Sequence, residues 1–267
     1  MIIQKGDFMK SGFTMAEVLI TLGIIGIIAA MTLPTVITNY KKMRTLTVLK
    51  RAYSDISNLF LDFKTDTGCY DYLNNCFPGW GEFRDEFAKY LHNKRGFHDK
   101  FSVYNAQIPI NRLEGGYGGL RSYYPTNIEE SQNRLLVAPN GTYILGLELN
   151  QDDNYYQLDN NGLANPPNYF RAMIFIYTDP NMVRWVLDKK ATKNTPTLGK
   201  EIFNLFIMAD GQIIPNGSSK CSVISSWNYH CQNWEVMQTC NKDNTYYRNG
   251  YGCLARIIGD GWQIKYY

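Results

Sequence analysis

A long apolar segment close to the start of this chain limits what the chain can fold into. Residues 13–32 contain one ionisable side chain, Glu17, and Pro34 closes the segment two residues later. At about 1.5 Å of rise per residue, a helix of this length is about 30 Å long, which matches the thickness of the hydrocarbon layer of a bilayer. The segment therefore predicts a membrane-spanning helix.

Two other interpretations compete with a membrane helix. Lys5 and Lys10 could form the basic region of a cleaved signal peptide. The apolar run is long for such a peptide, however, and no cleavage site of the Ala-x-Ala type follows it. A helix buried in a protein core is the second alternative, but nothing else in the chain is as apolar. The membrane helix is favoured over both.

The carboxylate of Glu17 is unfavourable inside an apolar helix unless something compensates for it. At the centre of a bilayer the cost is roughly 2.5–3.5 kcal/mol, and it falls towards either end of the helix. Because Glu17 lies only four residues after Phe13, its side chain either has a cationic partner or reaches the lipid headgroups. Both interpretations stay open at this point.

The start of the segment resembles a known processing signal. Residues 12–17 read Gly-Phe-Thr-Met-Ala-Glu and lead into the apolar run, which is similar to the amino terminus of type IV pilins and type II secretion pseudopilins. The resemblance implies that a prepilin peptidase cleaves between Gly12 and Phe13 and methylates the new amine of Phe13. Counted from Phe13, Glu17 is the fifth residue and Pro34 the twenty-second, where this family characteristically has Glu and often has Pro. The match covers about 30 of the 267 residues, and Met15 stands where Leu is commoner.

The resemblance implies an α+β fold, in which a long amino-terminal helix packs on an antiparallel β-sheet and the carboxyl-terminal region contains disulfides. The expected segments are a prepilin leader at 1–12, a transmembrane and filament-core helix at 13–33, an amphipathic continuation at 34–64, and an extracytoplasmic globular domain at 65–267. The expected location is the inner membrane, crossed once, and later a filament in the periplasm or at the cell surface.

The same resemblance implies a set of partners. These are the prepilin peptidase, other pilin-like subunits, an assembly platform in the inner membrane, and membrane lipid. No nucleic acid is expected, because 27 Lys and Arg against 24 Asp and Glu leave a net charge of only +3. A protein that binds nucleic acid electrostatically needs a clustered basic face.

The residues after Pro34 predict that the helix continues. Apolar side chains recur at intervals of three and four residues from Leu46 to Phe63, which places them on one helix face. The full stripe is Leu46, Leu49, Tyr53, Ile56, Phe60 and Phe63. We expect the helix to reach about Lys64 and to end at Gly68. We also expect Pro34 to kink or open it, because proline lacks a donor N–H.

Beyond this helix, short apolar runs alternate with turns. Residues 65–130 read as irregular apart from a short helix at 81–92. Runs typical of strands lie at 135–138, 142–147, 172–177, 183–187, 203–208 and 213–214. Two hairpins are expected, one around Asn140 and Gly141 and one around residues 209–212. Residues 221–257 are expected to cover an edge of the sheet.

Six cysteines indicate disulfides, since none of them has the Cys-x-x-Cys spacing of a zinc site. Disulfides form in oxidising compartments, which the expected location provides. Six cysteines allow 15 connectivities. Their spacing beside turns favours pairing between neighbours along the chain, namely Cys69–Cys76, Cys221–Cys231 and Cys240–Cys253.

Catalytic and cofactor-binding motifs are not found. The three histidines are scattered, and neither a metal-ligand motif nor a nucleophile elbow is present, so we expect no enzyme, no cofactor and no metal. Asp188 and Glu201 belong to a stretch that looks like a loop of pilin-like proteins, some of which bind Ca²⁺. Two carboxylates are few for an ion that takes roughly 6–8 oxygen ligands, so a structural turn is favoured.

These observations favour a minor pilin or pseudopilin that is processed by prepilin peptidase and assembled into a type IV pilus or a type II secretion filament. The alternative is a secreted, disulfide-stabilised binding or adhesion protein whose first 30 residues are a cleaved signal peptide. The two hypotheses differ in the mature amino terminus, which is Phe13 in the first and lies near Ala30 in the second.

Overall fold

The computed structural model describes residues 12–70, 72–78, 82–101, 134–149, 170–179, 197–208, 210–216 and 250–267, together with positions 218, 240, 241 and 243. The chain divides into two compact units, residues 1–44 and residues 45–267. Of the described elements, the first unit contains only the beginning of the long helix α1. The second unit contains the rest of α1, the sheet and the shorter helices.

Helix α1, Met15–Thr67, is the longest described element. It ends in a glycine cap, because Gly68 has a φ of +70°. The N–H of Gly68 donates to the carbonyl of Thr65 at 3.3 Å, and the N–H of Cys69 donates to the carbonyl of Lys64 at 3.0 Å. This pair of bonds is the Schellman motif, which satisfies carbonyls that the last helical turn leaves open. The prediction that the helix ends at Gly68 is confirmed.

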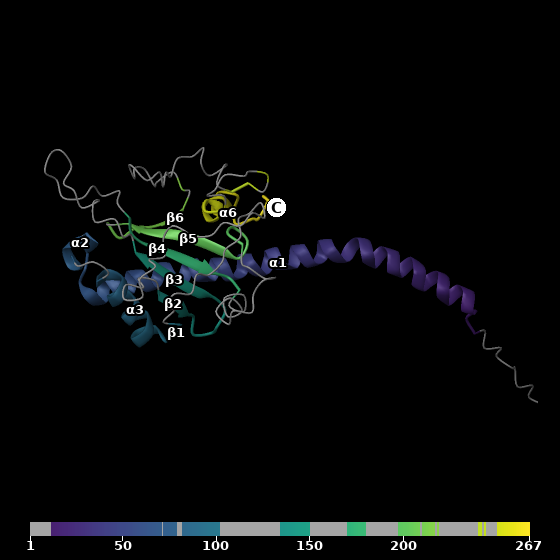
Figure 1. Ribbon diagram of the computed structural model, residues 1–267, viewed down its shortest axis with the longest axis horizontal. Helices are drawn as coiled ribbons and strands as arrows, with labels where there is room; N and C mark the ends of the chain where they lie inside the picture. The colour runs from purple at the N-terminus through teal and green to yellow at the C-terminus, as the bar shows by residue number, and fades with distance from the viewer. Residues whose placement is uncertain are drawn as a thin grey trace, which may run out of the picture. The chain divides into compact units, whose positions relative to one another are not determined.

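The described residues of the second unit form an antiparallel sheet of six strands, which lie in the order β1 to β6 (Figure 1). The strands are β1 His98–Phe101, β2 Arg134–Val137, β3 Ile144–Leu149, β4 Phe170–Tyr177, β5 Ile202–Met208 and β6 Ile213–Pro215. The short helices are α2 Leu73–Cys76, α3 Glu82–Arg95 and α6 Cys253–Gly259. A long amino-terminal helix and an antiparallel sheet confirm the α+β class.

One face of the sheet shares a buried core with the second part of α1. Since side chains alternate along a strand, every second residue of the central strands enters this core. From β4 and β5 these are Ala172, Ile174, Ile176, Phe203, Leu205 and Ile207. From α1 they are Leu49, Ala52, Ile56, Phe60 and Phe63, with Leu46 and Tyr53 partly buried beside them. The predicted apolar stripe is therefore the buried face of the helix.

Aromatic rings join α1 to α3. The ring of Phe63 lies 5.2 Å from that of Phe87, and the ring of Phe60 lies 6.1 Å from that of Phe83, both edge to face. Each such pair stabilises the fold by roughly 0.5–1.5 kcal/mol beyond the contribution from burying the rings. The helix expected at 81–92 is thus confirmed as α3, which runs three residues further, to Arg95.

Both expected hairpins are present. Between β2 and β3, the side-chain oxygen of Asn140 accepts from the N–H of Thr142 at 3.0 Å, and Gly141 has a φ of +65°. Between β5 and β6, Gly211 has a φ of +79°. A left-handed residue is needed at such turns, and glycine adopts it without steric cost. The strand expected at 183–187 lies outside the described residues.

The sequence interpretation was wrong for three short elements. Helix α2 and strand β1 lie within residues 65–130, where only one helix was expected, and α6 lies where only a covering segment was expected. The two helices and the strand have seven residues or fewer. Elements of this length show at most two repeats of a hydrophobic pattern. Contacts with other parts of the chain therefore determine whether such a segment forms a helix or a strand.

A hydrogen bond connects the turn between β2 and β3 to α1 across 88 positions of sequence. The hydroxyl of Tyr143 donates to a carboxylate oxygen of Asp55 at 2.9 Å, and the Nε of Arg51 lies 3.7 Å from that oxygen. Burial raises the pKa of Tyr143 well above its ordinary value, and the bond to Asp55 raises it further. The neutral phenol is therefore the form that the folded protein favours.

We expect Tyr143→Phe to lower the free energy of unfolding by about 1 kcal/mol at neutral pH. Because the phenol ionises in the unfolded chain at pH about 10 but not in the folded protein, the wild-type protein should lose stability above pH about 10, and the variant should lose less. Urea unfolding in mild detergent, at neutral pH and above pH about 10, measures the free energy of unfolding of both proteins. Tyr70→Phe, at an exposed tyrosine, is the control, and equal effects of both substitutions would contradict the expectation.

Candidate functional site

The expected processing site lies in an exposed, non-helical segment directly before α1. Residues 12–14 are not helical, and the side chain of Phe13 is 89% exposed. A Cβ placed on Gly12 would have no atom within 4 Å. Within the described chain, nothing therefore requires glycine at this position, so any requirement for a small residue there comes from a partner.

Thr14 and Glu17 form a reciprocal cap at the first turn of α1. The N–H and the hydroxyl of Thr14 both donate to a carboxylate oxygen of Glu17, each at 2.8 Å. In return, the N–H of Glu17 donates to the Thr14 hydroxyl oxygen at 3.3 Å. This arrangement is a capping box, which satisfies N–H groups that the first helical turn leaves without partners.

The cap changes the interpretation of Glu17. The sequence is compatible with a cationic partner for Glu17 or with a side chain that reaches the headgroups, whereas in the structure Glu17 accepts hydrogen bonds from its own helix end. The spacing Thr-x-x-Glu before an apolar run is a known signature of a capping box, so the sequence itself contains the signal for this cap, which was not among the predictions. A charged partner from another molecule stays a prediction.

The apolar side chains of the first part of α1 are exposed in the described structure. They include Val18, Leu19, Ile20, Leu22, Ile24, Ile25, Ile27, Ile28, Met31, Leu33, Val36 and Ile37. Among the described residues, α1 is one helix that is long and apolar enough to cross a membrane, and none of its apolar stretch is buried. A core helix would be mostly buried. A signal sequence would also have this length and composition.

Several threonine hydroxyls in this stretch donate to carbonyls of the same helix. Thr32 donates to the carbonyl of Ile28 and Thr38 to the carbonyl of Pro34, both at 2.9 Å. Such bonds allow hydroxyl groups in an apolar environment, where an unpaired donor is unfavourable. Pro34 lies inside α1, and the helix continues through it without a break, so the expected local opening is not seen. A kink at Pro34 stays a prediction.

Two of the three expected disulfides lie within the described residues. Cys69 is bonded to Cys76, with their Cα atoms 5.9 Å apart, so the bond closes the loop that follows the cap of α1 and contains α2. Cys240 is bonded to Cys253, with their Cα atoms 4.9 Å apart. Cys221 and Cys231 lie outside the described residues.

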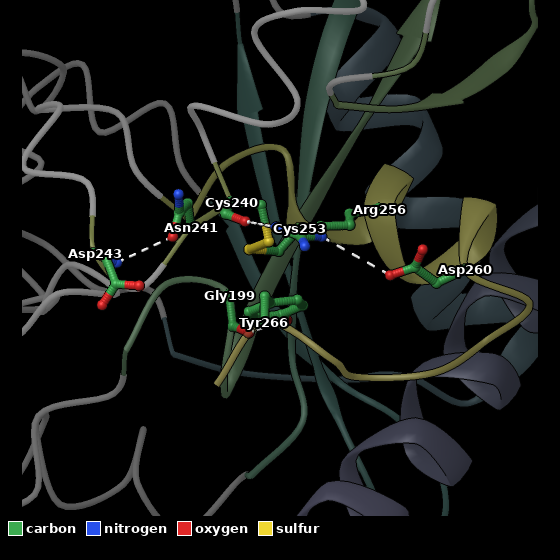
Figure 2. Close-up of a disulfide and its surroundings, with 8 residues drawn as sticks. All are labelled: Gly199, Cys240, Asn241, Asp243, Cys253, Arg256, Asp260 and Tyr266. Atoms are coloured by element: carbon green, nitrogen blue, oxygen red, sulfur yellow. Dashed lines mark hydrogen bonds and ion pairs between the residues drawn. A yellow bond between two sulfur atoms is a disulfide. The ribbon is translucent and has the colours of Figure 1, made fainter.

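The Cys240–Cys253 disulfide lies at the centre of a set of contacts that we call the C-terminal clasp, formed by the disulfide, Gly199, Arg256 and Tyr266 (Figure 2). The hydroxyl of Tyr266 donates to the carbonyl of Gly199. The guanidinium of Arg256 donates to the carbonyl of Cys240. Burial raises the pKa of Tyr266, which keeps this donor protonated. The clasp therefore holds the last residues of the chain against the turn before β5.

We expect removal of the Cys240–Cys253 bond, by replacing both residues with alanine, to lower the free energy of unfolding by roughly 2–5 kcal/mol. The same change at Cys69 and Cys76 should cost somewhat less, because that bond spans 7 positions of sequence rather than 13. Unfolding in urea measures both variants. Thiol titration of the unreduced, denatured protein is the control, and six free thiols would contradict both bonds.

We expect Gly199→Ala to destabilise the clasp. Gly199 has a φ of +81°, and a Cβ there would lie 2.6 Å from the sulfur of Cys253. Gly141→Ala is the matched control, since Gly141 has a φ of +65° and a Cβ there meets no atom within 4 Å. Both variants carry a left-handed strain of about 1 kcal/mol. In urea unfolding, only Gly199→Ala should lose more free energy of unfolding than this. Equal losses in the two variants would contradict the close contact with the sulfur of Cys253.

The described residues contain no group of three or more His, Cys, Asp or Glu side chains that could hold a metal ion. Of the two carboxylates considered for Ca²⁺, Asp188 lies outside the described residues. The carboxylate of Glu201 accepts from the N–H of Thr197 at 2.9 Å, and the N–H of Glu201 donates to the carbonyl of Thr197 at 3.0 Å. Glu201 thus takes part in a turn, and the absence of a Ca²⁺ site in the whole stretch stays a prediction.

Comparison of the chain with protein-family models, with curated proteins and with solved structures finds no match.

Proposed function

We propose that this chain is a pilin-like filament subunit of the minor pilin or pseudopilin kind. It is cleaved between Gly12 and Phe13 by a prepilin peptidase and methylated on Phe13. It crosses the inner membrane once through the first part of α1, with the sheet-containing unit outside the cytoplasm. It then joins other pilin-like subunits in a type IV pilus or a type II secretion filament. Its role is structural, without catalysis or a cofactor.

One observation carries the proposal, namely what lies at the start of α1. An exposed, non-helical peptide bond between Gly12 and Phe13 is followed directly by a helix whose apolar side chains are exposed and which contains the carboxylate of Glu17. A peptidase needs an accessible, extended substrate. Apolar side chains without a cover need lipid or neighbouring helices around them. Both requirements are met by insertion into a membrane, cleavage, and packing of such helices in a filament.

The geometry of the first turn supports a role for Glu17 after cleavage. Cleavage would leave an ammonium group on Phe13, directly beside the positive end of the α1 helix dipole, where a cation is unfavourable. Glu17 lies in that first turn and is the only carboxylate between Phe13 and Asp55. It is therefore the available counter-charge, for the amine of its own chain before assembly and for that of a neighbour afterwards.

The alternative is a secreted, disulfide-stabilised binding or adhesion protein with a cleaved signal peptide. The two disulfides found among the described residues support it as well, and the apolar stretch also fits a signal sequence in length and composition. The two hypotheses predict different mature chains, so the amino terminus decides between them.

The deciding experiment is mass spectrometry of the mature chain, produced in a bacterium that has a prepilin peptidase. We expect a chain that begins at N-methylated Phe13 and is recovered with the membrane fraction or with sheared filaments. A chain that begins near Ala30 and is recovered as a soluble secreted protein would overturn the proposal.

A further inference from the structure

A basic, aromatic segment directly follows the apolar stretch of α1. Tyr40, which is 67% exposed, is followed by Lys41, Lys42 and Arg44. Between Glu17 and Asp55 the sequence contains no carboxylate, so no acidic neighbour on the same stretch of helix balances Lys41 or Arg44. Lys41 and Arg44 are both exposed. The cleavage and assembly steps proposed above make no use of this segment.

Lys41 and Arg44 point to the same side of the helix. Residues three apart are neighbours on a helix surface, and residues four apart are as well, so Arg44 neighbours both Lys41 and Tyr40. Among the ion pairs of the described residues, none involves Lys41 or Arg44. Two adjacent cations beside an exposed phenol form a surface that attracts anions.

The distance along the helix places this surface at a defined depth. Lys41 lies 24 residues after Glu17 within α1, which corresponds to about 36 Å along a helix. This exceeds the hydrocarbon layer of about 30 Å but is less than the 40–45 Å that includes the headgroups. Glu17 and Lys41 can therefore lie in the headgroup regions of opposite leaflets at the same time.

We propose that Tyr40, Lys41 and Arg44 form an interfacial anchor that binds the phosphate groups of anionic phospholipids, in the leaflet opposite the one that Glu17 reaches. The inference rests on the proposed membrane insertion of α1. The long side chains of Lys41 and Arg44 extend to the phosphates, while the ring of Tyr40 lies at the boundary with the acyl chains. With charges at both ends, the unassembled subunit has one favoured depth in the bilayer.

The anchor also gives assembly a lipid-dependent step. When a subunit leaves the bilayer for a filament, Lys41 and Arg44 must release their phosphates. Each cation near an anionic surface strengthens its attraction by roughly 5-fold at low salt. Two cations should therefore produce a preference for anionic over zwitterionic lipid of up to roughly 25-fold, and salt should reduce it by screening.

The test is native mass spectrometry of the full chain, released from vesicles of equal parts phosphatidylglycerol and phosphatidylcholine. We expect the wild-type protein to retain phosphatidylglycerol several-fold more than phosphatidylcholine. The double variant Lys41→Gln with Arg44→Gln should retain the two lipids about equally. The double variant Lys94→Gln with Lys265→Gln, which removes two exposed cations elsewhere, should behave as the wild-type protein does. Because every variant carries the same leader, Lys5 and Lys10 cannot account for a difference.

Flotation of the chain on vesicles separates failure of this inference from failure of the proposed function. A chain that does not float with the vesicles, or that alkaline pH releases from them as it releases peripheral proteins, would overturn both. A chain that floats but retains both lipids equally, or whose Lys41→Gln and Arg44→Gln variant keeps the preference, would overturn the anchor alone. A third outcome would also contradict the anchor: the wild-type protein shows no lipid preference, and the Lys41→Gln and Arg44→Gln variant fails to enter filaments. An acidic protein surface, rather than lipid, would then be the partner of the two cations.

Discussion

Gly12→Val should slow removal of the leader by roughly 10-fold to 200-fold, the range over which an enzyme pocket discriminates against a misfitting aliphatic group, so uncleaved chain should accumulate. The chain itself tolerates a side chain at this position, because a Cβ on Gly12 meets no atom within 4 Å and the segment is not helical. Loss of cleavage would therefore report recognition by the peptidase rather than damage to the fold. The ratio of uncleaved to cleaved chain in membranes, measured by intact mass, gives the effect.

The matched control for this variant is Gly23→Ala. Gly23 lies within α1, and a Cβ there also meets no atom within 4 Å, so it changes a glycine of the same unit without touching the cleavage site. We expect normal cleavage of this control. Normal cleavage of Gly12→Val, or equal loss in both variants, would contradict recognition at Gly12.

Glu17→Ala should leave insertion and cleavage largely intact but reduce the entry of subunits into filaments. In a single subunit the carboxylate is satisfied by Thr14 or by the headgroups. In a filament core the headgroups are out of reach, and we expect the amine of Phe13 on a neighbouring subunit to be its partner. Removing one member of a buried ion pair costs roughly 3–5 kcal/mol, which corresponds to a loss of more than about 100-fold in an equilibrium. The measurement is the fraction of processed subunit in sheared filaments relative to membranes.

The capping box requires a second variant, because Glu17→Ala removes both the charge and the cap. Glu17→Gln keeps an acceptor for the N–H and hydroxyl of Thr14, since glutamine also closes a capping box, but it removes the charge. If the negative charge of Glu17 is what pairs with the amine of the neighbouring subunit, Glu17→Gln should fail to enter filaments as Glu17→Ala does. Normal entry of Glu17→Gln would show that the cap is what matters. Normal entry of Glu17→Ala would contradict both explanations.

The parts of the fold that were predicted correctly depend on contacts within a few residues. The stripe that ends at Phe63, the cap at Gly68 and the turn at Gly141 each follow from local periodicity or from a left-handed glycine. The capping box of Thr14 and Glu17 is equally local and could have been predicted. In contrast, β1 has four residues and pairs with β2, so its own sequence carried too few repeats to predict it.

The sequence by itself determined the long apolar helix, its end, the hairpins and the residues expected at the processing site, because interactions between near neighbours decide all of them. Only the tertiary structure decided which distant groups meet. Tyr143 bonds to Asp55 across 88 positions, and Tyr266 bonds to Gly199 across 67. Such contacts form only after the chain has closed large loops, and the free energy that selects one partner over another is small beside the entropy of that closure. No short stretch of sequence contains that information.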